Sequence, residues 1–99
     1  MNIRFHEQAK HELDEAIEWY DMQAMGVGGR FKVALRGLLE KVKLHPDWFL
    51  KEEDDVYKAY VPKFPYKVLY TIEKHELVVW AIAHLHRRPR YWNARVRRS

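Results

Sequence analysis

Leu77-Val-Val-Trp-Ala-Ile-Ala-His-Leu85 is the stretch of this sequence that decides the fold. Successive side chains of a β-strand point to opposite faces, and both sets are largely apolar here. A strand of that kind belongs in the middle of a sheet, where both of its faces can be covered. We therefore expect the rest of the chain to be arranged around residues 77–85.

Two further β-rich runs precede this strand, and a short strand opens the chain. The runs cover residues 56–61 and 66–72, and two prolines separate them. Residues 73–76 are polar and form a tight turn before residues 77–85. Residues 1–5 alternate between apolar and polar side chains, which predicts a strand with one buried face.

Two amphipathic helices are predicted between the first strand and the β-rich half. Residues 7–24 repeat apolar side chains every three or four positions, and a second stripe of the same period starts at Val27. Glycines within residues 26–29 break the pattern between the two helices, and Pro46 stops the second. The helices should form an antiparallel hairpin. The acids of the first helix are interpreted as a solvated face: Glu7, Glu12, Asp14, Glu15, Glu18 and Asp21.

The order of these elements predicts an α+β fold. Residues 47–55 are expected to be an acidic connector, and residues 90–98 a C-terminal tail or short helix. The predicted order is β-α-α-β-β-β plus this tail, with the helical hairpin packed on one face of a small, mainly antiparallel sheet. Residues 1–99 are short enough to form one domain.

The composition predicts where in the cell the protein is located and which class of partner it binds. The chain has no cysteine, no apolar run near membrane-spanning length and no signal-peptide pattern at its start, which predicts a soluble cytoplasmic protein. Its net charge of +4 is uneven. Residues 1–50 carry seven basic and eight acidic side chains, whereas residues 51–99 carry eleven and six. This asymmetry favours a polyanionic partner, either a nucleic acid or an acidic protein.

The last sixteen residues are strongly basic. They contain six arginines, two histidines and a Tyr-Trp pair, and no acid. Arginine forks fit phosphate oxygens and aromatic faces stack on bases, so Arg88, Arg90, Tyr91 and Arg95 are candidates for binding a nucleic acid or another target. Trp92 is expected instead to dock the tail back onto the core.

Five residues near the sheet are candidates for catalysis. Lys58, Lys67 and Arg87 could gather on the sheet face that the hairpin leaves open and basic. His84 and His86 share one face of a strand and could transfer protons. The alternatives are solvated lysines and histidines with structural hydrogen bonds. No ligand cluster accompanies the histidines, so neither a metal nor another cofactor is expected.

Three segments of this chain resemble a known family. They are Ala16-Ile-Glu-Trp-Tyr20, Phe64-Pro-Tyr-Lys-Val-Leu-Tyr70 and Val79-Trp-Ala-Ile-Ala-His-Leu-His-Arg-Arg-Pro-Arg-Tyr-Trp92 followed by Arg95. The whole chain resembles a toxin of the RelE/ParE superfamily, from bacterial type II toxin–antitoxin (plasmid stabilisation) modules. RelE-like members of this superfamily cut mRNA in the ribosomal A site. ParE-like members bind and poison DNA gyrase.

The resemblance carries over part of a ribonuclease site. RelE-like cleavage needs a base for the 2′-OH proton, cations for the phosphorane charge and an acid for the 5′-oxygen. Lys58, Lys67 and Arg87 fall at cationic positions of that site. Tyr60 replaces its second lysine, and Asn93 stands at its C-terminal tyrosine position. Other ribonuclease members of the superfamily use a histidine near this end, and His84 or His86 could take that role.

The resemblance implies a toxin that inhibits bacterial growth and is neutralised by a cognate antitoxin. The first hypothesis is a ribosome-dependent mRNA endoribonuclease, and the alternative is a DNA gyrase inhibitor without catalysis of its own. A second alternative is a non-toxic module that binds nucleic acid. Whether the chain is an enzyme stays open at this stage. An extended or helical antitoxin segment should wrap the toxin and offset its basic surface.

Overall fold

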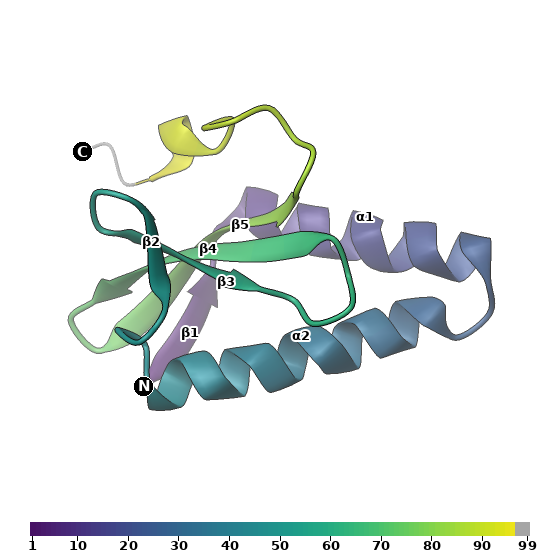
Figure 1. Cartoon of the computed structure of the whole chain (residues 1–99), viewed down its shortest axis with the longest axis horizontal. Helices are drawn as coiled ribbons and strands as arrows, with labels where there is room; N and C mark the ends of the chain where they lie inside the picture. The colour runs from purple at the N-terminus through teal and green to yellow at the C-terminus, as the bar shows by residue number, and fades with distance from the viewer. Residues whose placement is uncertain (97–99) are drawn as a thin grey trace.

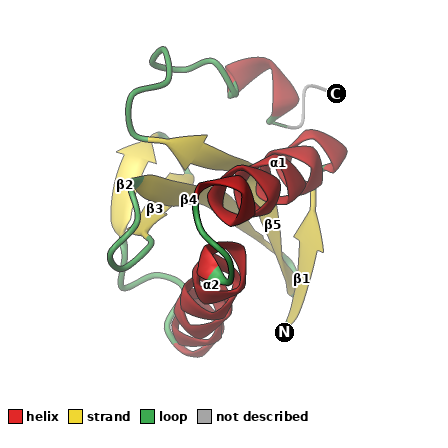
Figure 2. Cartoon of the chain, turned by 90° about the vertical axis from the view of Figure 1, so that its right-hand side faces the viewer, coloured by secondary structure: helices red, strands yellow, loops and turns green. Residues whose placement is uncertain are grey.

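A computed structural model describes residues 1–96 of the chain. It has two α-helices and one five-stranded sheet, and the helices lie against one face of that sheet (Figures 1 and 2). The predicted α+β architecture is therefore confirmed. The elements in chain order are β1 (Asn2–Phe5), α1 (Glu7–Gln23), α2 (Val27–Leu44), β2 (Leu50–Glu53), β3 (Val56–Tyr60), β4 (Tyr66–Glu73), β5 (Glu76–His84) and the 3-10 helix η1 (Asn93–Arg95).

Strand β5 lies inside the sheet, as its apolar faces predict. The strand order is β1-β5-β4-β3-β2, with β1 parallel to β5 and every other pair antiparallel. The pairing of β1 with β5 runs from Asn2–Glu76 to Phe5–Val79. The chain then turns away into α1, so the outer edge of β5 beyond Val79 must be satisfied by something other than β1.

Strand β2 corrects one expectation. Residues 47–55 were expected to be a connector, but Leu50–Glu53 pairs antiparallel with β3 and forms an edge of the sheet. The register shifts between Lys51 and Glu53, which leaves Glu52 as an extra residue at a bulge. The sequence Leu-Lys-Glu-Glu is poor in strand-forming residues. The strand forms because β3 offers it backbone hydrogen bonds, and that partner is not visible in the local sequence.

The hairpin side of the sheet holds the larger apolar core. Phe31 of α2 and Tyr70 of β4 are both 0% exposed. Phe31 and Tyr20 meet the rings of Phe64 and Tyr66 at centroid distances of 5.1 to 6.1 Å. The Tyr70 hydroxyl donates a 2.6 Å hydrogen bond to the carbonyl of Pro46, so the end of α2 is tied to the sheet.

The junction between the helices depends on two glycines. Gly26 has a φ of +86°, a conformation that a residue with a Cβ rarely adopts. Gly28 lies in the first turn of α2, and a Cβ there would come within 2.5 Å of the carbonyl oxygen of Ile17. Its N–H instead donates to the Asp21 carboxylate at 2.8 Å. The glycines that break the helical pattern thus also let α1 and α2 approach each other closely.

The second face of the sheet is partly covered by the C-terminal segment, which corrects the expectation of an open basic face. Trp92 and Val96 are buried in a second cluster with Leu69, Val78 and Trp80. The segment after β5 crosses above the sheet (Figure 1). Docking of Trp92 onto the core is therefore confirmed. The predicted tail also included Arg97 and Arg98, which lie outside the described residues.

Candidate functional site

The carboxylate of Glu12 is the centre of the polar contacts that hold the C-terminal segment. Its side chain is 9% exposed. It accepts hydrogen bonds from the Tyr91 hydroxyl at 2.8 Å and from both terminal nitrogens of Arg95 at 3.0 and 2.9 Å. It also accepts one from the backbone N–H of Ile82 at 3.0 Å. Glu12 was expected on a solvated face, so its burial is a correction.

The local backbone explains why a carboxylate is needed here. Beyond Val79, β5 has lost β1 as its neighbour, and Glu12 of the adjacent α1 receives the N–H of Ile82. Arg95 donates to the carbonyl oxygen of Trp80 at 3.0 Å. Two side chains thus satisfy backbone groups along an edge that would otherwise need another strand.

Arg87 and Arg95 both contact the ring of Tyr91. The guanidinium carbon of Arg87 lies 3.8 Å from the ring centroid and that of Arg95 lies 5.0 Å from it. Arg87 also approaches the Glu12 carboxylate at 3.9 Å. Burial raises the pKa of Tyr91, and its hydrogen bond to Glu12 and the Glu12 charge raise it further. Burial lowers the pKa of Arg95, but Glu12 more than offsets this, and the net pKa of Arg95 is raised.

Lys58 and Lys67 converge on one carboxylate. The ammonium of Lys67 lies 2.9 Å from Glu52 Oε1, and that of Lys58 lies 3.7 Å from the same oxygen. All three side chains are only about a fifth exposed. The two lysines therefore share a face, as predicted, but both pair with Glu52, a residue that sequence reasoning left in a connector. Only a correct assignment of β2 could have placed Glu52 beside them.

The two histidines lie together, but β5 ends at His84 and His86 lies in the turn beyond it, so the expectation that both belong to one strand is wrong. Their ring centroids are 5.2 Å apart, and the backbone N–H of His86 donates to Nδ1 of His84 at 3.0 Å. His84 also meets the ring of Tyr66 edge-on at 5.1 Å. His86 is exposed, whereas His84 is half-buried. This hydrogen bond orients the His84 ring and engages only its Nδ1 nitrogen.

The two remaining candidates for target binding, Arg90 and Arg88, have different surroundings. Arg90 adopts a φ of +60° and pairs with Glu53 of β2 at 2.7 Å. Arg88 is exposed. The predicted site residues are thus divided among the Glu52 cluster, the histidine pair, the Glu12 cluster and the Arg90–Glu53 pair. Their roles in catalysis or target binding stay predictions.

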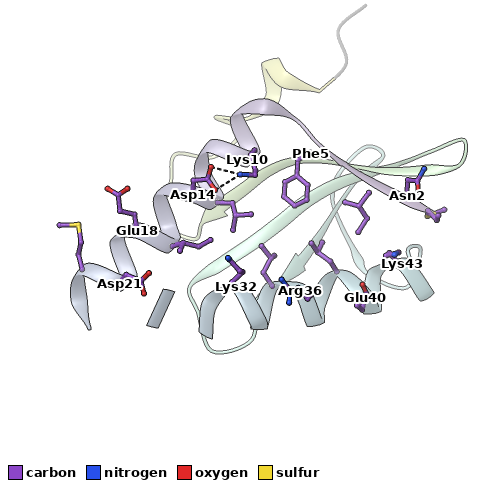
Figure 3. Close-up of a pocket in the computed structure, with 17 residues that line it drawn as sticks. Asn2, Phe5, Lys10, Asp14, Glu18, Asp21, Lys32, Arg36, Glu40 and Lys43 are labelled. Carbon is purple, nitrogen blue, oxygen red and sulfur yellow. Dashed lines mark hydrogen bonds and ion pairs between the residues drawn. The ribbon is translucent and has the colours of Figure 1, made fainter. Parts of the chain in front are cut away.

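A groove lies between α1, α2 and β1, and we call it the hairpin groove (Figure 3). Its volume is about 980 Å³. Its apolar lining comes from Ile3, Phe5, Leu13, Ile17, Leu35 and Leu39. The wall from α1 is lined by three acids and one lysine: Asp14, Glu18, Asp21 and Lys10. The facing wall from α2 is lined by three basic side chains and one glutamate: Lys32, Arg36, Lys43 and Glu40. The groove therefore has an apolar floor between an acidic rim and a basic rim.

Residues 1–96 contain no group of three or more His, Asp or Glu side chains placed to hold a metal ion. Over the same residues, no helix is long and apolar enough to cross a membrane.

A solved structure has a similar arrangement of helices and strands. A chain described as "Chromosomal ParDE TA system from P. aeruginosa" has a similar structure, with a TM-score of 0.63. The match covers 85% of this chain and 95% of that chain at 16% sequence identity, so the likeness shows the fold. The two chains therefore share the arrangement of helices and strands.

The family follows from the sequence match. The ParE toxin of type II toxin–antitoxin system, parDE, matches residues 3–91. This protein therefore belongs to the ParE toxin family, and a cognate antitoxin is its partner. No curated protein sequence matches it.

Proposed function

We propose that this toxin inhibits bacterial growth by binding DNA gyrase in the cytoplasm, without catalysis of its own, and that residues 1–99 form a single toxin domain. Membership of the ParE family supports this choice, because ParE-like members are the gyrase poisons of the superfamily that the sequence resembles. In this proposal the toxin acts by binding another protein, and the residues that matter are those on the binding surface.

The observation that carries the proposal is the internal pairing of the candidate cations. A ribonuclease stabilises the charge of the phosphorane with cations that are directed at the reacting phosphate. Here Lys67 and Lys58 share the Glu52 carboxylate, and Arg87 lies over Tyr91 beside Glu12. Each of these cations already contacts a carboxylate that it shares with a second cation, which lowers its value for holding a phosphate.

Purified gyrase tests the proposal directly. Relaxed plasmid, ATP and gyrase are incubated with increasing toxin, and supercoiling is measured on agarose. We expect supercoiling to stop, and induced cells to mount an SOS response. Toxin premixed with its antitoxin is the matched control. Normal supercoiling in cells and in vitro, together with arrested growth, would contradict the proposal.

A second candidate function, mRNA cleavage, is favoured by one feature of the same cluster. A carboxylate within 3.7 Å of two ammonium groups can serve as a base while the lysines hold the phosphate. Glu52→Gln separates the two functions, with Glu53→Gln as the neighbouring control. If the protein cleaves mRNA, Glu52→Gln abolishes both growth arrest and cleavage in a translation extract. If it inhibits gyrase, growth arrest persists.

The hairpin groove fits the antitoxin. Its apolar floor suits the apolar stripe of an amphipathic helix, and its oppositely charged rims would orient that helix. Basic residues of the antitoxin would face α1, and acidic residues would face α2. We expect Arg36→Glu, on the α2 rim, to weaken co-purification of the antitoxin by about tenfold or more in affinity.

The control for this variant lies on the same helix. Arg30 is also exposed but does not line the hairpin groove, so Arg30→Glu makes the same charge change outside it. Equal antitoxin affinity for the two variants would exclude the hairpin groove as the docking site.

A further inference from the structure

A second groove lies on the other side of α1, between that helix and the ends of β4 and β5. We call it the aromatic groove. Its volume is about 780 Å³. The lining residues that matter here are Glu15, Trp19, Tyr20, Tyr66, His84 and Arg87. Glu18 lines both grooves, so it marks the ridge of α1 that separates them.

Aromatic rings form a continuous row in this groove. Trp19 meets Tyr20 at a centroid distance of 5.3 Å, and Tyr20 meets Tyr66 at 6.1 Å. Tyr66 then meets His84 at 5.1 Å. Trp19 is 55% exposed although tryptophan is a costly residue to leave in water. The exposed ring of Trp19, at one end of the row, is therefore accessible to a partner.

The charge of this groove is negative although the chain has a net charge of +4. Burial raises the pKa of Tyr66, and the charges of Tyr20, Glu12 and Glu15 raise it further, so Glu15 acts electrostatically on the groove interior. The lining holds three glutamates, Glu12, Glu15 and Glu18, against one arginine, Arg87, which lies 3.9 Å from Glu12.

We propose that the aromatic groove receives an arginine or lysine side chain of the toxin's protein target. A guanidinium or ammonium group gains energy over tryptophan and tyrosine faces, and a nearby carboxylate adds an ion pair. The alkyl stem of such a side chain covers apolar ring surface. This inference rests on the proposed function, in which the target is gyrase. Since the proposed function places the antitoxin in the hairpin groove, target and antitoxin would use opposite sides of α1.

Two adjacent acids of α1 provide a matched test. Glu15 lines the aromatic groove, whereas Asp14 lines the hairpin groove. Each is exposed and pairs with the basic residue four positions earlier, Asp14 with Lys10 at 2.9 Å and Glu15 with His11 at 3.4 Å. We expect Glu15→Lys to raise the toxin concentration for half-inhibition of purified gyrase by about tenfold or more, with antitoxin affinity kept. Asp14→Lys should keep gyrase inhibition.

The aromatic part of the groove has its own matched pair. Trp19→Ala removes the exposed ring, and Trp48→Ala removes another exposed tryptophan that stacks on His45 outside the groove. We expect Trp19→Ala to weaken gyrase inhibition several-fold, Trp19→Phe to restore part of it, and Trp48→Ala to leave it unchanged. Retained binding of the antitoxin shows that each variant is folded.

The outcomes separate this inference from the proposed function. If the wild-type toxin leaves supercoiling intact, the proposed function fails and the inference fails with it. If the wild type blocks supercoiling but Glu15→Lys and Trp19→Ala act like their controls, only the inference fails. If Glu15→Lys loses the antitoxin and still blocks gyrase, the groove belongs to the antitoxin, and the inference is overturned.

Discussion

The two faces of the sheet are closed in different ways. On the hairpin face, two helices cover the strands with a wide apolar core that includes Phe31 and Tyr70. On the tail face, Trp92 and Val96 cover a smaller apolar cluster. That cover is held by hydrogen bonds from Tyr91 and Arg95 to one carboxylate.

The hairpin face depends on apolar burial, whereas the tail face depends on hydrogen bonds to a buried carboxylate. Burial of apolar area is roughly additive and tolerates small displacements. A buried carboxylate instead needs all its partners in place, because each lost partner leaves a desolvated polar group. The hairpin face should therefore determine global stability, whereas the tail face should respond to single polar substitutions and to pH.

The largest effect is expected on the hairpin face. Phe31→Ala removes a fully buried ring between the helices and the sheet. We expect the free energy of unfolding to fall by about 3–5 kcal/mol, measured by chemical denaturation. Val33→Ala, on the exposed side of the same helix, should change it by less than about 0.5 kcal/mol. Similar losses for the two variants would refute the comparison.

A smaller and more local effect is expected from Glu12→Gln. The change leaves Arg95 without its ion pair and removes one acceptor of the Glu12 cluster. We expect a loss of about 2–3 kcal/mol, with faster hydrogen exchange in the C-terminal segment than in α2. Asp14→Asn breaks only an exposed pair with Lys10 and should cost less than about 1 kcal/mol. Uniform exchange across both faces would argue against a separately held tail.

The smallest effect at neutral pH is expected from Tyr91→Phe. Losing its hydrogen bond to Glu12 should cost about 1 kcal/mol. The pKa of Tyr91 is raised in the folded protein above the ordinary tyrosine value of about 10. Its stabilising contribution is therefore complete below about pH 10 and is lost as the pH rises through the folded pKa.

Alkaline titration measures this effect. Unfolding of wild-type protein above about pH 10 is followed by circular dichroism, and tyrosinate formation by ultraviolet absorbance. The Tyr91→Phe variant should lose less of its remaining stability over that range. Tyr60→Phe, at an exposed position, is the control. A wild-type protein whose stability does not change there would count against the Glu12–Tyr91 contact.

Much of the fold could be predicted because its signals are local. The period of the apolar residues identifies both helices, and alternation or continuous apolarity identifies β1, β3, β4 and β5. Gly26 and Pro46 mark where the helical hairpin turns and ends. Each of these signals lies within a short window of the chain, so no tertiary contact is needed to interpret it.

The candidate site was less predictable because its contacts join distant segments. Glu12 and Arg95 are 83 positions apart in the chain. In the sequence, Glu12 is one of several acids in its helix, so nothing local shows that this one is buried. Glu52 lies in a strand that forms only because β3 offers it backbone partners. Sequence reasoning did place Lys58 and Lys67 on one face, because each lysine alternates with neighbours that pack on the hairpin side of its strand.

The amino-acid sequence alone predicts the two helices, four of the five strands, the docking of Trp92 and the superfamily, because these depend on apolar periodicity and on one contiguous motif. Three features emerge only on folding: the basic tail is bound to Glu12, Glu52 pairs with two lysines, and α1 separates an aromatic groove from a hairpin groove. The physical reason is that a charged side chain gives the same local signal whether it is solvated or buried. Its partner, brought near by folding, decides which it is.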